Sequence, residues 1–280
     1  MAVGFDICMV TVRLQCHEVV FDKPETHSPM RFLITNDDGF DAPGLAALYS
    51  ALCTIGDIDV VAPAECHSAK GHAVNTRNGI RVDRQTMEPF GEIHIAHASP
   101  ADCVRLGLRG LNLDPPDFVI AGINPGANLG VDLYYSGTAA AAREAAIMRV
   151  PSLAVSRYIE PNGLINWQEL SNHVRRIVGK LISHEYRLPE GQFWNVNFPA
   201  IPDDQHPGEI AIAPMGLFSH AVDFECKQTG DNTTILQYSS DFRCRAITGN
   251  CDISHVLDGH ITATPVDLSN TANHAMLPSF

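Results

Sequence analysis

MRFLITNDDG, residues 30–39, joins a continuous, strand-forming run to a short polar turn. An unbroken run of this kind is typical of a strand that is buried on both faces of a parallel sheet. After the turn, Asp41, Pro43 and Gly44 precede apolar residues that recur every three or four positions, which is the spacing of an amphipathic helix. The stretch therefore predicts a strand over 30–35, a turn that carries two carboxylates, and a helix.

The alternation of strand and helix continues along the chain. Further strands are expected over 57–62, 92–98, 117–124, 151–156 and 193–198, and helices over 101–108, 138–149 and 167–182. This order is typical of α/β proteins in which a mostly parallel, doubly wound sheet lies between two layers of helices. We therefore expect a three-layer, Rossmann-like fold.

The character of the sequence changes after Pro199. Residues 201–245 are rich in turn formers and hold short alternating segments such as EIAIAP and TTILQY, which predict hairpins projecting from the core, one with its tip at 229–231. The last apolar stretch, DISHVLDGHITATPV, predicts a short helix and a closing strand. We divide the chain into an unassigned extension (1–29), an α/β core (30–200), and a segment with the hairpin arm and the C-terminal helix and strand (201–280).

Charge and composition exclude several classes of protein. The 280 residues include 19 Lys and Arg against 32 Asp and Glu, a net charge of −13, which disfavours a nucleic-acid duplex as partner because such a partner needs a broad basic surface. No apolar run is long enough to cross a membrane, and acidic residues interrupt every candidate leader within 1–29. The eight cysteines show no CxxC pair. We therefore predict a cytoplasmic protein with reduced thiols.

The loops that follow the predicted strands carry the candidate chemistry, because ligands of parallel sheets bind at the carboxyl ends of the strands. In the first loop, Asp37 and Asp38 are adjacent carboxylates directly after a buried strand, and a hard divalent cation would offset the cost of burying them. The alternative is that one of them only caps the following helix. Ser68 lies in the second loop, where His67 and His72 are a weak indication of zinc because their spacing is not that of a helical zinc motif.

Two later loops complete the pattern. Residues 122–130, GINPGANLG, combine glycines with Asn124 and Asn128, although a sharp turn alone could account for them. YYSGT, residues 134–138, precedes an alanine-rich helix, and its hydroxyl and N–H groups suit either an anion or an ordinary helix cap. A cation site that faces an anion site is the arrangement needed for hydrolysis of a phosphate ester.

Taken together, these motifs resemble those of the SurE survival-protein family of metal-dependent nucleotide phosphatases. The matching segments run in family order from residue 30 to 265 and include MRFLITNDDGFDAPGLAAL, SPADCVRLGL, PDFVIAGINPGANLG and LYYSGTAAAAREA. The NDDG, GINxGxN and YSGT elements are highly specific in combination. The resemblance implies a 5′/3′-nucleotidase that releases phosphate from nucleoside 5′- and 3′-monophosphates, with short polyphosphate as a possible further substrate. It also implies a homodimer or homotetramer formed through the arm at about 201–245.

The resemblance further implies roles for individual residues. One divalent ion per subunit, magnesium or manganese, would be held by the oxygen donors of Asp37, Asp38, Ser68 and Asn124, with the two aspartates as the catalytic residues. The implied phosphate contacts are Asn36, Gly39, Asn128, Ser136, Gly137 and Thr138.

The sequence departs from the family pattern at several places, and other functions stay open. Cys66 and His67 stand where the family usually has a more basic run, Ala69 replaces a glycine, and His260 replaces a tyrosine.

The main alternative is a phosphoryl-accepting, receiver-like signalling module, which would need a third carboxylate where the chain has Asn124 and Asn128. A dinucleotide-binding oxidoreductase would need a GxGxxG motif, which follows none of the predicted strands.

Overall fold

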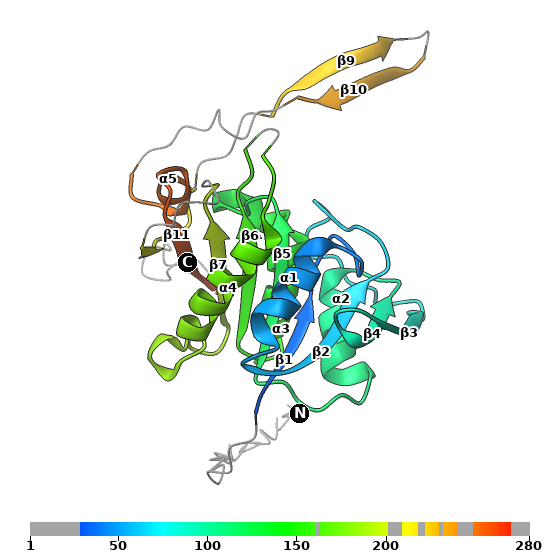
Figure 1. Ribbon diagram of the computed structural model, residues 1–280. Helices are drawn as coiled ribbons and strands as arrows, with labels where there is room; N and C mark the ends of the chain where they lie inside the picture. The colour runs from blue at the N-terminus through cyan, green and yellow to red at the C-terminus, as the bar shows by residue number, and fades with distance from the viewer. Residues whose placement is uncertain are drawn as a thin grey trace, which may run out of the picture.

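The computed structural model describes residues 29–160, 163–200, 209–217, 222–229, 232–239 and 249–269. Within these residues a nine-stranded sheet runs in the order β3-β4-β2-β1-β5-β6-β7-β11-β8, and β9 and β10 form a separate two-stranded hairpin. Figure 1 shows the sheet surrounded by helices, with the hairpin held away from it. No helix of the described residues is long and apolar enough to cross a membrane.

The secondary structure follows the predicted order closely. The strands of the main sheet are β1 (Met30–Thr35), β2 (Gly56–Pro63), β3 (Val82–Met87), β4 (Gly91–Ala96), β5 (Phe118–Pro125), β6 (Ser152–Arg157), β7 (Gln192–Phe198), β8 (Ile210–Ile212) and β11 (Ile261–Asp267). The hairpin consists of β9 (Phe224–Thr229) and β10 (Thr234–Tyr238). The helices are α1 (Pro43–Leu52), α2 (Pro100–Arg105), α3 (Gly137–Ile147), α4 (Trp167–Leu181) and α5 (Asp252–Leu257), with short helical turns at Leu106–Gly110, Gly130–Tyr134 and His184–Tyr186.

The pairing of the strands confirms the α/β, mostly parallel fold. β1 lies parallel to both β2 and β5, and the parallel arrangement continues to β4 on one side and through β6 to β7 on the other. β3 pairs antiparallel with β4, and β11 pairs antiparallel with β7. The sequence analysis missed β3, whose central residues are exposed and polar and therefore lack the apolar pattern of a strand.

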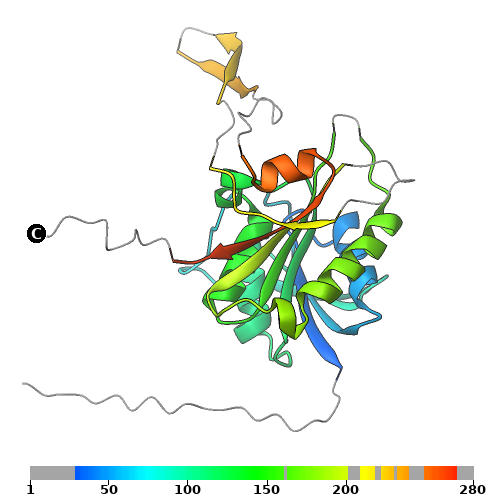
Figure 2. The same ribbon diagram turned by 90° about the vertical axis from the view of Figure 1, so that its left-hand side faces the viewer.

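Residues of β1 alternate between two helical layers. Phe32 and Ile34 are buried in the cluster that contains residues of α1 and α4, whereas Leu33 is buried in the cluster with α2 and α3. Figure 2 shows helices on both sides of the sheet. The alanines of α3 are all buried, and their small size lets this helix approach the sheet closely. The N-terminus of α3 is thereby held next to the loop after β1.

The segment after residue 200 divides between the sheet and the hairpin. EIAIAP was expected in a projecting hairpin, but its central residues form β8, which pairs parallel with β11 at the edge of the main sheet. Such a short alternating run does not distinguish a hairpin strand from an edge strand. β9 and β10 form the predicted projecting hairpin (Figures 1 and 2). The residues 1–28 and the proposed tip at 230–231 lie outside the described part of the chain.

Candidate active site

Asp37, at the end of β1, is the most deeply buried acid of the candidate site. Its side chain is buried, and its Oδ1 accepts a hydrogen bond of 2.5 Å from Thr138 Oγ1 in the first turn of α3. Burial raises the pKa of Asp37, and the hydrogen bond from Thr138 partly offsets that rise. The structure therefore brings together two predicted site residues that are 101 positions apart.

The N-terminus of α3 packs directly on Asp37. Ser136 caps the helix, and its Oγ accepts a hydrogen bond of 2.9 Å from the backbone N–H of Ala139. At Gly137 an added Cβ would lie only 2.7 Å from the Cβ of Asp37 and 2.9 Å from its Oδ2. The close approach requires glycine, and it places the positive end of the helix dipole beside the acidic pair.

Asp38 differs from Asp37 in that part of its carboxylate has no partner. Its Oδ2 is buried and finds no hydrogen-bond donor among the described residues, and the same is true of Oδ1 of Asn36. Burial, with a smaller contribution from the charge of Asp37, raises the pKa of Asp38 to about 6. Buried oxygens without donors beside a second carboxylate are what a hard divalent cation requires, so these residues fit such an ion.

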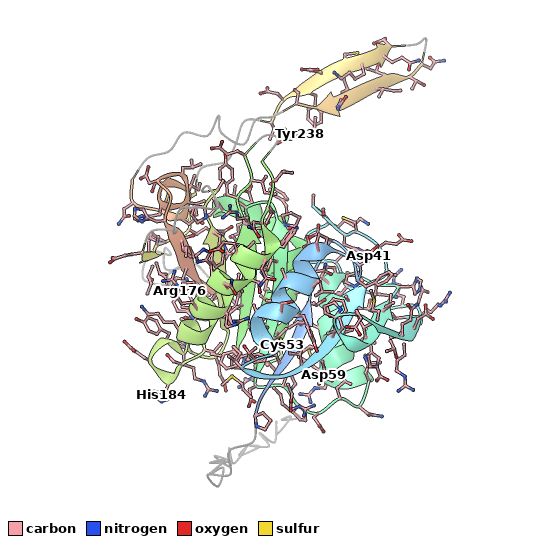
Figure 3. All side chains as sticks on the ribbon, in the orientation of Figure 1. Asp41, Cys53, Asp59, Arg176, His184 and Tyr238 are labelled. Carbon is pink, nitrogen blue, oxygen red and sulfur yellow. The ribbon has the colours of Figure 1, made fainter. Side chains whose placement is uncertain are left out.

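Asn36 and Gly39 shape the turn that carries the two aspartates. Asn36 Nδ2 donates a hydrogen bond of 2.7 Å to the carbonyl oxygen of Gly39, and Gly39 has φ of +118°, which favours glycine. Both residues are buried. They hold the turn compact. Figure 3 labels Asp41 near the end of α1 that adjoins this turn and Cys53 near the other end of the helix.

The Ser68 turn approaches the acidic pair from the end of β2. The backbone N–H of His67 donates a hydrogen bond of 2.7 Å to the carbonyl oxygen of Asp37, and the N–H of Gly71 donates one of 2.9 Å to that of Tyr135. Ser68 lies between these two anchors with an exposed side chain, and its Oγ is 3.0 Å from Cys66 Sγ. Burial, with a contribution from Lys70, lowers the pKa of His67.

The two asparagines of the loop over 122–130 have different surroundings. Asn124 is half-buried at the end of β5, and its Nδ2 donates to the carbonyl oxygen of Gly126. Asn128 is buried, and its Nδ2 donates a hydrogen bond of 2.7 Å to Ser156 Oγ. Its backbone is bonded to the side chains of Asn195 and Asn197 in β7. Asn128 therefore ties its loop to β6 and β7, and its role as a phosphate contact stays a prediction.

An ionic network around the buried Glu144 was not found from the sequence. Glu144 of α3 accepts from His72 Nε2 at 2.7 Å and from Arg105 Nε at 3.0 Å, so His72 has a carboxylate partner. Within the described residues no group of three or more His, Cys, Asp or Glu side chains could hold a metal ion. The only signal in the sequence was the pair Arg143 and Glu144 within the alanine-rich run of α3.

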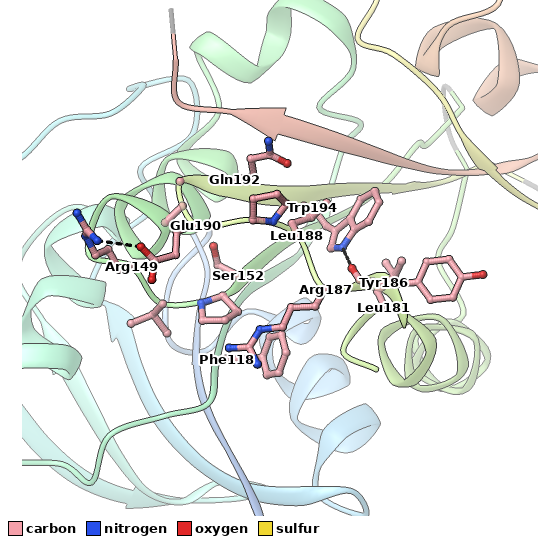
Figure 4. Close-up of a pocket in the computed structure, with 15 residues that line it drawn as sticks. Phe118, Arg149, Ser152, Leu181, Tyr186, Arg187, Leu188, Glu190, Gln192 and Trp194 are labelled. Carbon is pink, nitrogen blue, oxygen red and sulfur yellow. Dashed lines mark hydrogen bonds and ion pairs between the residues drawn. The ribbon is translucent and has the colours of Figure 1, made fainter. Parts of the chain in front are cut away.

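A pocket at the opposite end of the strands is separate from these residues. It is lined by residues at the start of β5, β6 and β7, among them Phe118, Ser152 and Gln192, whereas the acidic pair follows the end of β1. Figure 4 shows Trp194 donating a hydrogen bond to the carbonyl oxygen of Tyr186 in its wall, and the Arg149–Glu190 ion pair. The pocket therefore does not belong to the candidate active site.

Comparison with known proteins identifies the family. The model of the family described as survival protein SurE matches residues 32–220. The chain belongs to the SurE family. It is 38% identical over 245 residues to the 5′-nucleotidase SurE of Geotalea uraniireducens, covering 86% of this chain and 94% of that one. It is 41% identical over 247 residues to the 5′-nucleotidase SurE of Chloroflexus aggregans, covering 87% and 95%.

A solved SurE structure confirms the fold. The crystal structure of the SurE protein from Aquifex aeolicus superposes with a TM-score of 0.74 at 30% sequence identity, covering 88% of this chain and 96% of that one. The predicted family and the predicted fold class are both confirmed.

In this SurE-family site, Thr138 is expected to stabilise the folded protein through Asp37. Replacement of Thr138 by Val keeps the shape but leaves the buried Oδ1 of Asp37 without its hydroxyl donor. We expect a loss of about 1–3 kcal/mol in the free energy of unfolding, the usual cost of a buried polar group that loses its partner. Urea unfolding in the presence of a chelator measures it. Thr138→Ser should retain most of the stability, and a Val variant as stable as the original protein would contradict the assignment.

The raised pKa of Asp38 predicts an unusual pH dependence of stability without metal. Because the folded protein holds the Asp38 proton up to about pH 6 while the unfolded chain releases it near 3.8, this group stabilises the folded state at low pH. That contribution is lost as pH rises through about 6. In chelator, the unfolding midpoint of the original protein should fall more between pH 5 and 7.5 than that of Asp38→Asn, and manganese should restore it at pH 7.5. Equal pH dependence in the two proteins would contradict this prediction.

Proposed function

We propose that this protein is a divalent-metal-dependent phosphomonoesterase that hydrolyses nucleoside 5′- and 3′-monophosphates to nucleoside and phosphate. The observation that carries the proposal is the partnerless buried Oδ2 of Asp38, which adjoins Asp37, the acid on which the N-terminus of α3 packs. The names of the SurE relatives, which are 5′-nucleotidases, support the same substrate class.

The residues have distinct proposed roles. Asp37, Asp38, Ser68 and Asn124 would hold one magnesium or manganese ion, which would polarise the phosphoryl group and lower the pKa of the attacking water. The N-terminus of α3, with the hydroxyl of Ser136, would bind phosphate oxygens and stabilise the charge that develops on them. Thr138, the other predicted phosphate contact of this turn, donates a hydrogen bond from its hydroxyl to Asp37 and would hold that acid in place. Gly39, Gly137, Asn36 and Asn128 would shape the pocket that receives the phosphate.

Hydrolysis of a nucleotide panel tests this function. The protein is stripped with a chelator, and phosphate release from 5′- and 3′-nucleoside monophosphates is measured with magnesium, manganese, cobalt or zinc restored singly. Release that requires an added hard divalent ion is the expected result, and the panel ranks the substrates. Release that is unaffected by chelation, or absent with every ion, would contradict the proposal. Short polyphosphate in the same assay tests the further substrate.

The proposal also includes a homodimeric or homotetrameric assembly and a cytoplasmic location. The hairpin β9–β10 exposes large apolar side chains, including Phe224, Ile235 and Leu236, which fits a role as the arm of a homodimer or homotetramer. Light scattering of the purified protein at several concentrations distinguishes these assemblies from a monomer. A cytoplasmic location rests on the sequence alone and would be tested by fractionation of cells.

A further inference from the structure

The Ser68 turn is anchored at its ends, where the N–H of His67 donates to Asp37 and that of Gly71 to Tyr135, while the residues between them have few contacts with the rest of the protein. Ser68, Ala69 and Lys70 are exposed, and within the turn the backbone N–H of Lys70 donates a long hydrogen bond of 3.3 Å to the carbonyl oxygen of His67. Ala69 has φ of +57°, a left-handed conformation that is uncommon for residues other than glycine. The position of Ser68 therefore depends on the residues on either side of the turn.

The segment after the turn is fixed by a series of bonds to α2 and α3. Ser99 Oγ donates a hydrogen bond of 2.6 Å to the carbonyl oxygen of Ala73, and both carboxylate oxygens of buried Asp102 accept from the N–H of Asn75, at 3.1 and 3.0 Å. Closest to the turn, His72 Nε2 lies 2.7 Å from Oε2 of Glu144. His72 is thus the first side chain after the turn that attaches it to the interior.

Glu144 is well suited to hold His72 in one place. It is buried, with 6% of its surface exposed, and its second oxygen is held by Arg105 Nε at 3.0 Å. It lies on α3, the same helix whose Thr138 binds Asp37. The helix therefore sets the position of the acidic pair through its first turn and that of the Ser68 turn through Glu144.

We propose that His72, held by Glu144, is a positioning residue that fixes the Ser68 turn over the acidic pair and so raises the affinity of the site for a divalent ion. This inference rests on the proposed function, because it takes Ser68 as a ligand. A residue that orients a ligand from behind typically changes metal affinity by about 10–100-fold when it is replaced.

The test compares His72→Ala and His72→Gln with the original protein. His97→Ala is the matched control, because His97 also faces a carboxylate, Asp83 Oδ2 at 3.0 Å, but does so at the surface of the β3–β4 pair. Manganese affinity is measured by titration calorimetry, and the mobility of the turn by hydrogen exchange of the amides of 67–71. Neither measurement needs turnover.

His72→Ala is expected to bind manganese about 10-fold or more weakly and to exchange the amides of the turn faster. His72→Gln, which can still donate to Glu144, should restore much of the affinity, and His97→Ala should change neither quantity. Saturating manganese should recover kcat in His72→Ala, because the effect acts through binding of the ion. If His72→Ala does not fold, Glu144→Gln replaces it in the same comparison, with the same expected weakening.

A folded His72→Ala with unchanged manganese affinity and unchanged exchange would overturn the inference, as would equal losses in His97→Ala. These outcomes are separate from failure of the proposed function. If the original protein binds manganese but releases no phosphate from any nucleotide, the proposed function fails while the binding comparison still decides the role of His72. If the original protein binds no manganese, both are contradicted.

Discussion

Asp38→Asn is expected to lower phosphate release from nucleoside monophosphates by at least about 100-fold, because it removes a charged ligand and residues behind a ligand already cost 10–100-fold. The substitution keeps the size of the side chain but removes its negative charge. In the original protein one carboxylate oxygen of Asp38 is buried without a donor and is therefore available to a cation, and the Asn variant offers the cation no charge at this position. Manganese affinity should fall with turnover.

The measurement is the initial rate over a range of manganese concentrations, combined with calorimetric binding. Asp41→Asn is the matched control, since Asp41 is an exposed carboxylate three positions along the same loop. It should leave both quantities nearly unchanged. Unlike His72→Ala, Asp38→Asn should not recover full turnover at saturating metal. Unchanged activity in a well-folded Asp38→Asn protein would exclude Asp38 as a ligand.

The sequence predicted most of the fold because a parallel sheet with buried strands leaves a strong local pattern. MRFLIT and FVIAGIN are continuous apolar runs, and they became β1 and β5 with nearly the predicted bounds. β3 was not predicted, because its central residues are exposed and polar. β8 was assigned to a hairpin, because a strand of three residues has too little pattern to indicate which strand it pairs with. Pairing of distant strands depends on tertiary packing, which local periodicity does not encode.

Local sequence patterns identified parts of the candidate site that the structure brings together, while their roles stay predictions. The adjacent acids after β1 and the hydroxyl-rich start of α3 were both recognised, and the structure joins them through Asp37 and Thr138. The pairing of His72 with Glu144 could not be predicted, because the residues are 72 positions apart and each has an ordinary local context. The engagement of Asn128 by β6 and β7 likewise depends on neighbours that only the folded sheet supplies.

Gly137→Ala is expected to reduce turnover strongly while the protein still folds. An added methyl group would lie 2.7 Å from Asp37 Cβ and 2.9 Å from its Oδ2, closer than ordinary van der Waals contact allows, so either the helix start or the carboxylate must shift. We expect a loss of about 1–3 kcal/mol in the free energy of unfolding, the usual cost of overpacking. A shift of about 1 Å in a positioning group can cost about 100-fold in rate, and turnover should fall by at least that much.

Gly179→Ala is the control for the general effect of replacing glycine in a helix. Gly179 lies within α4, where an added Cβ would meet no atom within 4 Å, so the change should stabilise the helix by about 0.5–1 kcal/mol and leave activity intact. Urea unfolding and nucleotide hydrolysis are measured for both variants. Retained turnover in Gly137→Ala would mean that the start of α3 can withdraw from Asp37 without cost, and the close packing of the phosphate-binding helix on the acidic pair would then have no part in the reaction.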